Sequence, residues 1–365
     1  MSEIVVAGRG LAALTCALLL ARQDRRVRII GPETTGRRWL ILPEAVAELL
    51  GEVWGSEVGV LDAAWSVPRR HVRWGDNDRQ YVPAPSHALD GAALNQRLAA
   101  YLARNCGDQV RFDHRTPLSA NPIPPGDPAD GRWLITATPV PDSARFGVVG
   151  RRHIITAEAR ITPTCDSATC RMETSSQGWV YLAPVGKELA LVQAMVPGPV
   201  HRPVRLLSDL LGQTGLGAQL AEPPARASVV RAAPALLAPP CGPGWLAVGA
   251  AAIQFDPLSG SGAAQAVRTA ILATAAIDAI DRGHCAQDVL DHYAARLHTA
   301  FTVHLRSCLD RYGATFPGEA WQDEVDATAL ALRGPADDAQ MKFLLSGFRL
   351  QLRGGERSYS GHSDG

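Results

Sequence analysis

A glycine-rich turn lies between two apolar segments at the start of the chain. Residues 4–7 are mostly β-branched, the turn carries Gly8, Gly10 and Ala13 in the spacing GxGxxA, and an apolar segment leads to a second β-branched run at residues 27–30. This order of strand, turn, helix and strand is typical of the unit that opens a dinucleotide-binding fold. Gly8 permits the tight turn, Gly10 lets the backbone approach a pyrophosphate, and Ala13 allows close packing. A turn that only packs the helix onto the strand is the alternative.

One residue that such a unit usually carries is missing. An Asp or Glu at the end of the second strand commonly accepts hydrogen bonds from the adenosine ribose. Here Gly31 stands at that position, and the nearest acid is Glu33, two residues further on. We therefore expect a nucleotide site with a weakened ribose contact.

The composition limits the classes of partner. The chain has 365 residues, which favours one large domain or two interlocked ones, and 36 basic residues balance 36 acidic ones. Without a net charge no overall field attracts nucleic acid or an anionic membrane, and we expect neither as a partner. Lysine occurs only at positions 187 and 342, so a reaction that needs a lysine has two candidates.

Hydropathy and cysteine content are those of a globular chain. No apolar run reaches the roughly 18 to 20 residues that span a bilayer, and the longest, residues 11–21, is expected to be a buried helix. The amino terminus lacks the pattern of a secretory signal, so we expect a cytoplasmic location. Seven cysteines without a CxxC pair predict free, mostly buried thiols and no metal site.

Helical and strand patterns alternate along the rest of the chain. We expect helices at residues 44–50, 90–105, 206–220, 262–280, 285–312 and 323–332. We expect strands at residues 70–74, 80–83, 110–113, 132–138, 154–161, 178–184, 189–196, 227–233 and 245–248. The strands at residues 70–74 and 80–83 are predicted to form a hairpin. Together these patterns predict an α/β fold.

The segment at residues 244–262 carries the most specific pattern. An apolar strand ends at Gly249, a loop passes through Asp256 and Pro257, and a Gly-Ser-Gly turn opens a long alanine-rich helix. The free backbone amides and the positive dipole end at this helix start suit an electron-rich oxygen or an anion. The sequence therefore predicts that this turn faces a ligand.

This segment resembles the flavin-contacting stretch of FAD-dependent aromatic monooxygenases and flavin-dependent halogenases. In those families a Gly-Asp strand end meets the ribityl chain, a proline loop lies beside the isoalloxazine, and the next helix start faces its pyrimidine edge. Gly178–Pro184 is similar to the Trp-x-Trp-x-Ile-Pro strand of the halogenases, with Tyr181 and Ala183 substituted. Residues 135–138 stand where the family commonly has a strand ending in Asp-Ala-Thr-Gly. With the amino-terminal GxGxxA, the resemblance spans nearly the whole chain.

The resemblance implies an interleaved architecture. A Rossmann-like FAD-binding domain of the glutathione-reductase type, as in aromatic hydroxylases, is expected to alternate along the chain with a mixed-sheet substrate domain. The FAD-binding domain is expected at residues 1–68, 88–150 and 226–284. The substrate domain is expected at residues 69–87 and 151–225, followed by carboxy-terminal helices at 285–353 and a disordered tail at 354–365.

The resemblance also implies FAD as the cofactor. The amino-terminal turn would face the pyrophosphate, together with an arginine that the family has at a similar place to Arg38. The segment after residue 248 would face the flavin. The implied FAD-binding residues are Gly8, Arg9, Gly10, Leu11, Ala12, Ala13, Arg38, Gly249, Ala250, Pro257, Gly260, Ser261 and Gly262.

At three FAD-facing positions the chain departs from the family. Where the family has acids, this sequence has Gly31, Thr136 and Ala250. A carboxylate that accepts from a ribose or ribityl hydroxyl contributes roughly 1.5 to 3 kcal/mol, so one loss can cost about tenfold in affinity. Two interpretations follow. Either FAD binds weakly or with the help of a partner, or the chain is a non-catalytic, flavin-poor binding or assembly subunit.

The main activity that the resemblance implies is hydroxylation of an aromatic ring through a flavin hydroperoxide. The loop at residues 255–262 and the pattern at residues 306–321 look most like flavoproteins that mature tryptophylquinone cofactors by hydroxylating a protein-bound tryptophan. Halogenation is disfavoured because the halogenases use a lysine in their amino-terminal part, whereas the first lysine here is Lys187. A flavin-dependent reductase is a further alternative. Electrons are expected from an external flavin reductase or from NAD(P)H.

Four residues are candidates for catalytic or substrate contacts. On the predicted hairpin, His71 and Trp74 are three positions apart, so at most one faces the pocket, and His71 is either a proton donor or a structural histidine. Trp179 and Tyr181 share one strand face and line either an aromatic cavity or the core. Asp256 either acts near the flavin or stabilises its turn.

Overall fold

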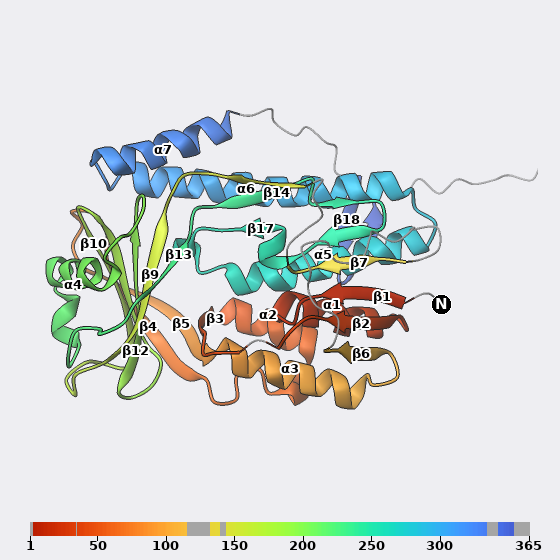
Figure 1. The fold of residues 1–365 in the computed structure, drawn as a ribbon, viewed down its shortest axis with the longest axis horizontal. Coiled ribbons are helices and arrows are strands. Elements are labelled where there is room, and N and C mark those ends of the chain that lie inside the picture. The colour runs from red at the N-terminus through yellow and green to blue at the C-terminus, as the bar shows by residue number, and fades with distance from the viewer. Residues whose placement is uncertain (1–2, 34, 115–131, 139–143, 334–341, 354–365) are drawn as a thin grey trace, which may run out of the picture.

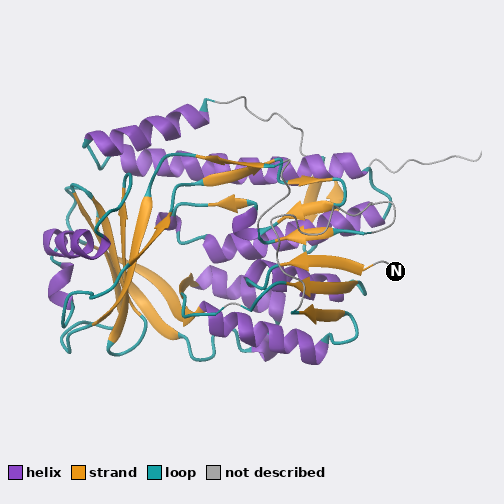
Figure 2. Cartoon of the chain, viewed as in Figure 1, coloured by secondary structure: helices purple, strands orange, loops and turns teal. Residues whose placement is uncertain are grey.

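Two large sheets surrounded by helices make up the computed structural model (Figures 1 and 2). The structure describes residues 3–33, 35–114, 132–138, 144–333 and 342–353, and the predicted tail at residues 354–365 lies outside them. A six-stranded sheet lies on the right of Figure 1 and an eight-stranded sheet on the left. The long helix α6 (Ala286–Gly313) runs along both. The predicted α/β class is confirmed.

The six-stranded sheet contains the amino-terminal βαβ unit. Its order is β15-β16-β7-β1-β2-β6, with all neighbours parallel from β16 to β6. Parallel strands are joined by helical crossovers that cover the sheet, which explains why every residue of α1 is buried. The strands are β1 (Glu3–Ala7), β2 (Arg26–Ile30), β6 (Val110–Asp113), β7 (Leu134–Thr136), β15 (Cys241–Gly242) and β16 (Trp245–Ala247). The helices that pack in this part are α1 (Leu11–Ala21), α2 (Glu44–Trp54), α3 (Gly91–Asn105) and α5 (Gly262–Asp281).

The eight-stranded sheet has the order β13-β9-β12-β11-β10-β4-β5-β3, and within it β4 and β10 form a parallel pair. Alternate residues point to its two faces. One face packs on helix α4 (Pro203–Thr214), at the far left of Figure 1, through residues such as Val180 and Leu182. The other carries Trp179 and Tyr181. The strands are β3 (Trp39–Pro43), β4 (Trp65–Arg73), β5 (Gln80–Asp90), β9 (His153–Arg160), β10 (Thr169–Ser175), β11 (Gly178–Pro184), β12 (Leu189–Val196) and β13 (Ser228–Arg231).

Smaller elements pack around these sheets. Helix α7 (Glu319–Leu332) packs on α6, as the top of Figure 1 shows. A three-stranded sheet contains β8 (Arg145–Val148), β14 (Ala235–Ala238) and β17 (Ile253–Gln254). A hairpin contains β18 (Phe343–Ser346) and β19 (Arg349–Leu352). Single 3-10 turns occur at Ser56–Val58, Leu216–Gln219, Gly249–Ala251 and Pro257–Ser259.

Several predicted boundaries differ from the structure. The helix predicted at residues 206–220 ends at Thr214, because Gly215 has a φ of +74° and turns the chain out of the helix. The hairpin predicted at residues 70–83 is longer, since β4 begins at Trp65 and β5 continues to Asp90. The sequence pattern does not predict β10, whose polar residues conceal its alternation. These changes enlarge the eight-stranded sheet.

The segments that build the two sheets alternate along the chain. Strand β3 and the start of β4 fall within residues 1–68, which the sequence assigns to the FAD-binding domain, yet both pair in the eight-stranded sheet. The chain therefore enters the eight-stranded sheet before residue 68, the predicted domain boundary. The domain division itself remains a prediction.

Helix α5 and the cysteines belong to the interior. By length and composition alone α5 could cross a membrane. However, 67% of its most apolar 18-residue stretch is buried inside the protein, as in a core helix. All seven cysteines are free and five of them are buried, which confirms the prediction of mostly buried thiols. Cys285 is exposed and Cys106 is half-buried.

Candidate functional site

A cavity of about 1580 Å³ lies between one face of the eight-stranded sheet and the segment at residues 249–265. Pockets for single small ligands usually measure roughly 300 to 1,000 Å³. This cavity therefore has room for two molecules side by side. Its walls come from strands β9 to β12, from the segments at residues 35–43 and 222–233, and from the loop before α5.

Two of the predicted substrate-side residues line this cavity and two hairpin residues do not. Trp179 and Tyr181 both line it, although each is less than 10% exposed. Arg70 lines it, whereas His71 lies outside the lining and packs its ring on Tyr81 at 5.6 Å. The register explains this correction, because β4 pairs in parallel with β10 and alternation turns His71 to the opposite face. Trp74 packs on Phe316 in the core instead.

Trp179 and Tyr181, which form an aromatic wall of the cavity, each make a side-chain hydrogen bond. Trp179 Nε1 donates to the hydroxyl of Tyr312 at 3.2 Å. Tyr181 donates its hydroxyl to Cys170 Sγ at 3.0 Å, and burial raises the pKa of Tyr181 well above the usual value of a phenol. Both rings are therefore fixed in place, and Tyr181 remains a neutral phenol.

The two predicted glycine turns are brought together by close backbone contacts. Gly249 has a φ of +60°, and a Cβ there would lie 2.9 Å from the Cβ of Ala12 in α1. Its N–H donates to Thr269 Oγ1 of α5 at 2.8 Å. Gly8 has a φ of +117°, and a Cβ there would lie 3.1 Å from the Cβ of Ala137. Segments near residues 8 and 249 thus meet at one place because glycine allows it.

Both helices that start from these turns have open amino-terminal ends. Gly10 caps α1 and Ser261 caps α5, and neither helix receives a side-chain hydrogen bond at its cap. A Cβ added at Gly10, Gly260 or Gly262 would meet nothing within 4 Å. The first amides of both helices are therefore available to ligand oxygens. The start of α5, with Pro257, Gly249 and Ala250, lines the cavity.

Arg9 pairs with Glu33 beside the predicted pyrophosphate turn, whereas Arg38 lies on the cavity. Arg9 is almost fully buried, stacks over Phe112 at 5.0 Å and places Nη1 3.3 Å from Glu33 Oε1. Its Nε and Nη2 have no hydrogen-bond partner among the described residues. Arg38 is exposed and lines the cavity. Gly31 has a φ of +117°, so the backbone itself disfavours an acid at that position and leaves Glu33 as the nearby carboxylate.

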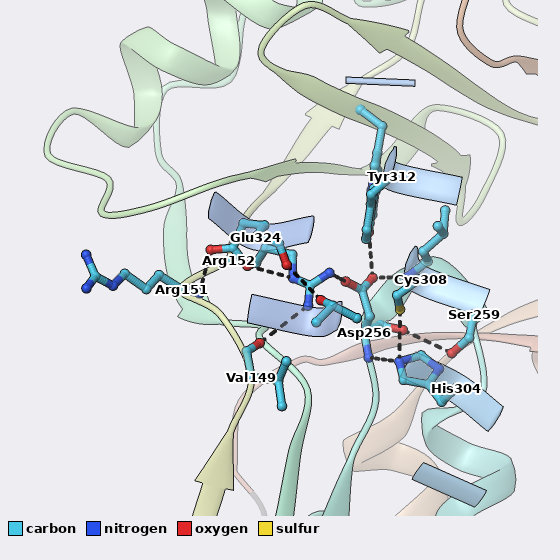
Figure 3. Close-up of polar contacts among 12 residues, drawn as sticks. Val149, Arg151, Arg152, Asp256, Ser259, His304, Cys308, Tyr312 and Glu324 are labelled. Carbon is cyan, nitrogen blue, oxygen red and sulfur yellow. Dashed lines mark hydrogen bonds and ion pairs between the residues drawn. The ribbon is translucent and has the colours of Figure 1, made fainter. Parts of the chain in front are cut away.

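A buried polar cluster lies behind the loop that carries Asp256 (Figure 3). Arg152 stands between two carboxylates, with Nη1 3.4 Å from Asp256 Oδ2 and Nε 3.2 Å from Glu324 Oε2. Asp256 Oδ1 accepts hydrogen bonds from the Tyr312 hydroxyl and from Leu258 N–H, each at 2.9 Å. These contacts join the loop to α6 and α7. Asp256 therefore stabilises its own turn and also anchors it to the carboxy-terminal helices.

The charges in this cluster do not balance when every group is ionised. One guanidinium faces the two carboxylates of Asp256 and Glu324, and the side chains of all three are at most 4% exposed. Burial raises the pKa of both Asp256 and Glu324, although Arg152 opposes the shift. One proton bound to this pair leaves the cluster neutral, which is the state that a buried site favours.

His304 completes the support of the loop from α6. Its Nε2 accepts the N–H of Asp256 at 2.8 Å, and its ring stacks on Phe255 with centroids 4.2 Å apart. A nitrogen that accepts a hydrogen bond carries no proton, so His304 is neutral in this geometry. Burial and the nearby Arg152 lower the pKa of His304 to about 4.

This geometry predicts an acid-sensitive contribution to stability. A histidine whose pKa falls on folding leaves the unfolded state with more bound protons, so its contribution is complete above the unfolded pKa near 6.5 and is lost as the pH falls toward 4. Acidification from pH 7 to pH 4.5 should therefore destabilise the protein more than its His304→Gln variant. Urea unfolding at both pH values measures this difference. Parallel losses in both proteins would contradict the neutral His304 contact.

Four residues of the site carry no sequence motif that marks them as its members: Arg152, His304, Tyr312 and Glu324. A partial signal exists in α6, where His304, Cys308 and Tyr312 recur every four residues and are all buried on one helix side. Nothing in the sequence indicates that this side of the helix meets Asp256.

No protein-family model and no curated protein matches the chain. Solved structures with a similar fold include flavin-dependent enzymes. The flavin-dependent halogenase CmlS aligns with a TM-score of 0.74 at 17% identity, over 90% of this chain and 69% of its own. QhpG, a peptidyl tryptophan dihydroxylase essential for tryptophylquinone cofactor biogenesis, aligns with a TM-score of 0.71 at 20% identity, over 96% of this chain and 86% of its own.

PqsL, a probable FAD-dependent monooxygenase from Pseudomonas aeruginosa, aligns with a TM-score of 0.65 at 15% identity, over 90% of this chain and 98% of its own. At such low identities the likeness establishes the fold. The chain therefore has the fold of flavin-dependent halogenases and monooxygenases, as its resemblance to them predicts.

Proposed function

We propose that the protein is an FAD-dependent monooxygenase that hydroxylates an aromatic ring, and that its substrate is a tryptophan held in a polypeptide. The observation that carries this proposal is the cavity of about 1580 Å³, with an aromatic sheet face on one side and the open start of α5 on the other. One side offers a helix end to a flavin and the other offers Trp179 and Tyr181 to an aromatic ring.

The residues present fit FAD. The pyrophosphate would lie against the α1 start, where Gly10 leaves open space and the unused donors of Arg9 are nearby. The pyrimidine edge of the flavin would face the first amides of α5, those of Gly262 and Ala263, because the amides of Gly260 and Ser261 already donate to the Pro257 carbonyl and to Ser259 Oγ. When bound and reduced, FAD supplies the two electrons that activate molecular oxygen.

The missing acids leave FAD with fewer hydrogen bonds in this site. The hydroxyl of Thr136 is occupied, since it donates to the carbonyl of Thr138 at 3.0 Å. Gly31 and Ala250 offer no side-chain acceptor at all. The absence of these acceptors favours modest FAD affinity. It also motivates a second candidate function, a flavin-poor binding or assembly subunit. Such a subunit would show no FAD binding at any FAD concentration.

Residues of the chain itself would orient the substrate ring and hold the loop before α5 in place. Trp179 and Tyr181 are held by hydrogen bonds and would fix the plane of the substrate ring. The Asp256 turn is anchored by Arg152, Tyr312 and His304, and it would thereby keep the loop before α5 in place for a bound flavin. In the overall reaction one oxygen atom of O₂ enters a ring C–H bond, and the other leaves as water, which takes two electrons and one proton from the hydride of an NAD(P)H-class reductant and a second proton from solvent.

Halogenation is less well supported by the cavity. Lys187 and Lys342 are the lysines of the chain, and neither is among the lining residues that the structure describes. Lys342 instead pairs with Asp288 at 2.7 Å. A lysine relay to a substrate in this cavity therefore has no candidate.

QhpG, which has a similar fold, is a peptidyl tryptophan dihydroxylase, and this supports a polypeptide substrate for the present protein.

Oxygen labelling tests this function. The protein would be incubated with FAD, a flavin reductase, NADH and ¹⁸O₂, together with a tryptophan-containing protein or peptide, and with a free phenol and a free indole in parallel. We expect ¹⁸O on the tryptophan ring by mass spectrometry. Label on the free phenol or indole alone would remove the polypeptide substrate, and hydrogen peroxide without any labelled product would remove the monooxygenase. Repeating the reaction with bromide tests for halogenated product.

A further inference from the structure

A row of uncharged polar residues crosses the sheet wall of the cavity. In the register of the sheet, Ser228 pairs with Thr156, Thr156 with Gln193, and Gln193 with Tyr181. Paired residues on adjacent strands point to the same face. All four line the cavity, and the neighbouring lining residues on these strands include Ile154, Trp179, Leu189 and Leu191.

Two members of this row have unused hydrogen-bonding groups. Ser228 Oγ donates to the carbonyl of Thr156 at 3.4 Å, and the Tyr181 hydroxyl donates to Cys170 Sγ at 3.0 Å. The hydroxyl of Thr156 and the amide of Gln193 make no hydrogen bond with any residue that the structure describes. Both side chains are half-buried and line the cavity, so their partner is water or a ligand.

The chemistry of these two side chains identifies the ligand group. A hydroxyl and a primary amide each both donate and accept, and neither is charged. A peptide group likewise offers one N–H and one C=O. The row from Thr156 to Tyr181 crosses two strand spacings, or about 10 Å, which is enough for an indole ring beside Tyr181 and its flanking peptide groups beside Gln193 and Thr156.

Two charged residues, Glu158 and Arg70, lie next to the row, and of these two only Arg70 has a side-chain donor that no described residue binds. Glu158, the next residue of β9 on this face, accepts from Trp39 Nε1 at 3.0 Å and pairs with Arg37 at 3.3 Å. Arg70 lies beyond Tyr181, on β4, and lines the cavity with its Nε unpartnered among the described residues. A carboxylate on the substrate would therefore be drawn to Arg70, away from Thr156 and Gln193.

We propose that Thr156 and Gln193 bind the peptide groups on either side of a substrate tryptophan and so select a tryptophan within a polypeptide over a free indole. This inference rests on the proposed function and adds a recognition site to it. A free indole leaves both side chains without a ligand partner, whereas a polypeptide satisfies them. Sites built to hydrogen-bond a substrate discriminate strongly against analogues that lack the matching group.

Equilibrium dialysis of the FAD-loaded protein under nitrogen, without reductant, tests the proposal. The probes are N-acetyl-tryptophanamide, which carries peptide groups on both sides of the side chain, and 3-methylindole, which carries the ring alone. We expect the first probe to bind at least about tenfold more tightly. In the Thr156→Val/Gln193→Leu variant this ratio should fall close to one while the affinity for 3-methylindole stays unchanged. Ser228→Ala is the matched control and should keep the ratio, since its hydroxyl is already bonded.

Two results would overturn the inference. The first is equal affinity of the wild-type protein for both probes, or an equal loss of affinity for both probes in the double variant. In either case Thr156 and Gln193 would not recognise peptide groups. The second is tightest binding by indole-3-propionate with loss of that binding in Arg70→Gln, because the wall would then select an anion. Binding is measured without oxygen, so selective binding with no later hydroxylation would contradict the proposed function alone. Conversely, equal hydroxylation of both probes would contradict the recognition site alone.

Discussion

Replacement of Arg152 by glutamine is expected to lower the free energy of unfolding by about 3 to 5 kcal/mol, the usual penalty for removing one partner of a buried ion pair. Arg152 is fully buried, and without it the carboxylates of Asp256 and Glu324 lose the guanidinium that pairs with both of them. Both carboxyl groups would then have folded-state pKa values well above their unfolded ones. Such a contribution to stability is present at low pH and is lost as the pH rises, so the defect should shrink between pH 7.5 and pH 5.5. Urea unfolding at both values measures it.

Two comparison proteins separate the charge effect from the loss of volume. In Arg152→Gln/Asp256→Asn/Glu324→Gln the unpaired charges are gone, and most of the stability should return. Arg160→Gln is the surface control, because Arg160 is 68% exposed and lies 3.7 Å from Glu188, and its change should stay within about 0.5 kcal/mol. Equal losses for Arg152→Gln and Arg160→Gln would show that the buried cluster does not anchor the Asp256 loop.

Substitution of Gly10 by valine is expected to reduce FAD affinity by about 100-fold, or roughly 2.7 kcal/mol, with little change in the stability of the protein without FAD. Gly10 has φ −83° and ψ 176°, which valine readily adopts, and a Cβ there meets no protein atom within 4 Å. The added side chain would occupy the space assigned to the pyrophosphate. Titration with FAD and thermal unfolding of the FAD-free protein measure the two quantities separately.

Gly8→Val provides the contrasting variant. Its φ of +117° and the 3.1 Å approach to Ala137 mean that any side chain there strains the fold itself, by about 1 to 3 kcal/mol. Stability and FAD affinity should therefore fall together in Gly8→Val, whereas they separate in Gly10→Val. Full FAD affinity in Gly10→Val would show that the pyrophosphate lies elsewhere.

Local sequence patterns predict those parts of the fold whose residues are close along the chain. The unit from β1 to β2 and the turn before α5 are each complete within about thirty residues, and their glycines have the backbone angles that their positions require. The wall formed by Trp179 and Tyr181 follows from strand alternation in the same way. These elements were predictable because hydrophobic period and turn chemistry specify them without the rest of the molecule.

Contacts between distant segments could not be predicted in this way. Arg152, Asp256 and Glu324 come from three separate regions, and only the packing of α6 along both sheets and of α7 on α6 brings them together. Alternation shows that His71 and Arg70 point to opposite faces, but the parallel pairing of β4 with β10 decides which of them meets the cavity. Thr156 and Gln193 become neighbours only through the register of β9 with β12.

Saturable binding of FAD is the most direct test of the account as a whole, because both the monooxygenase and its recognition site depend on it. The purified protein would be titrated with FAD, and the absorbance of the protein fraction at about 450 nm recorded after gel filtration and by dialysis. We predict one FAD per chain with a finite dissociation constant that Gly10→Val weakens. A colourless protein with no saturable binding would contradict the account and leave a flavin-poor assembly subunit as its function.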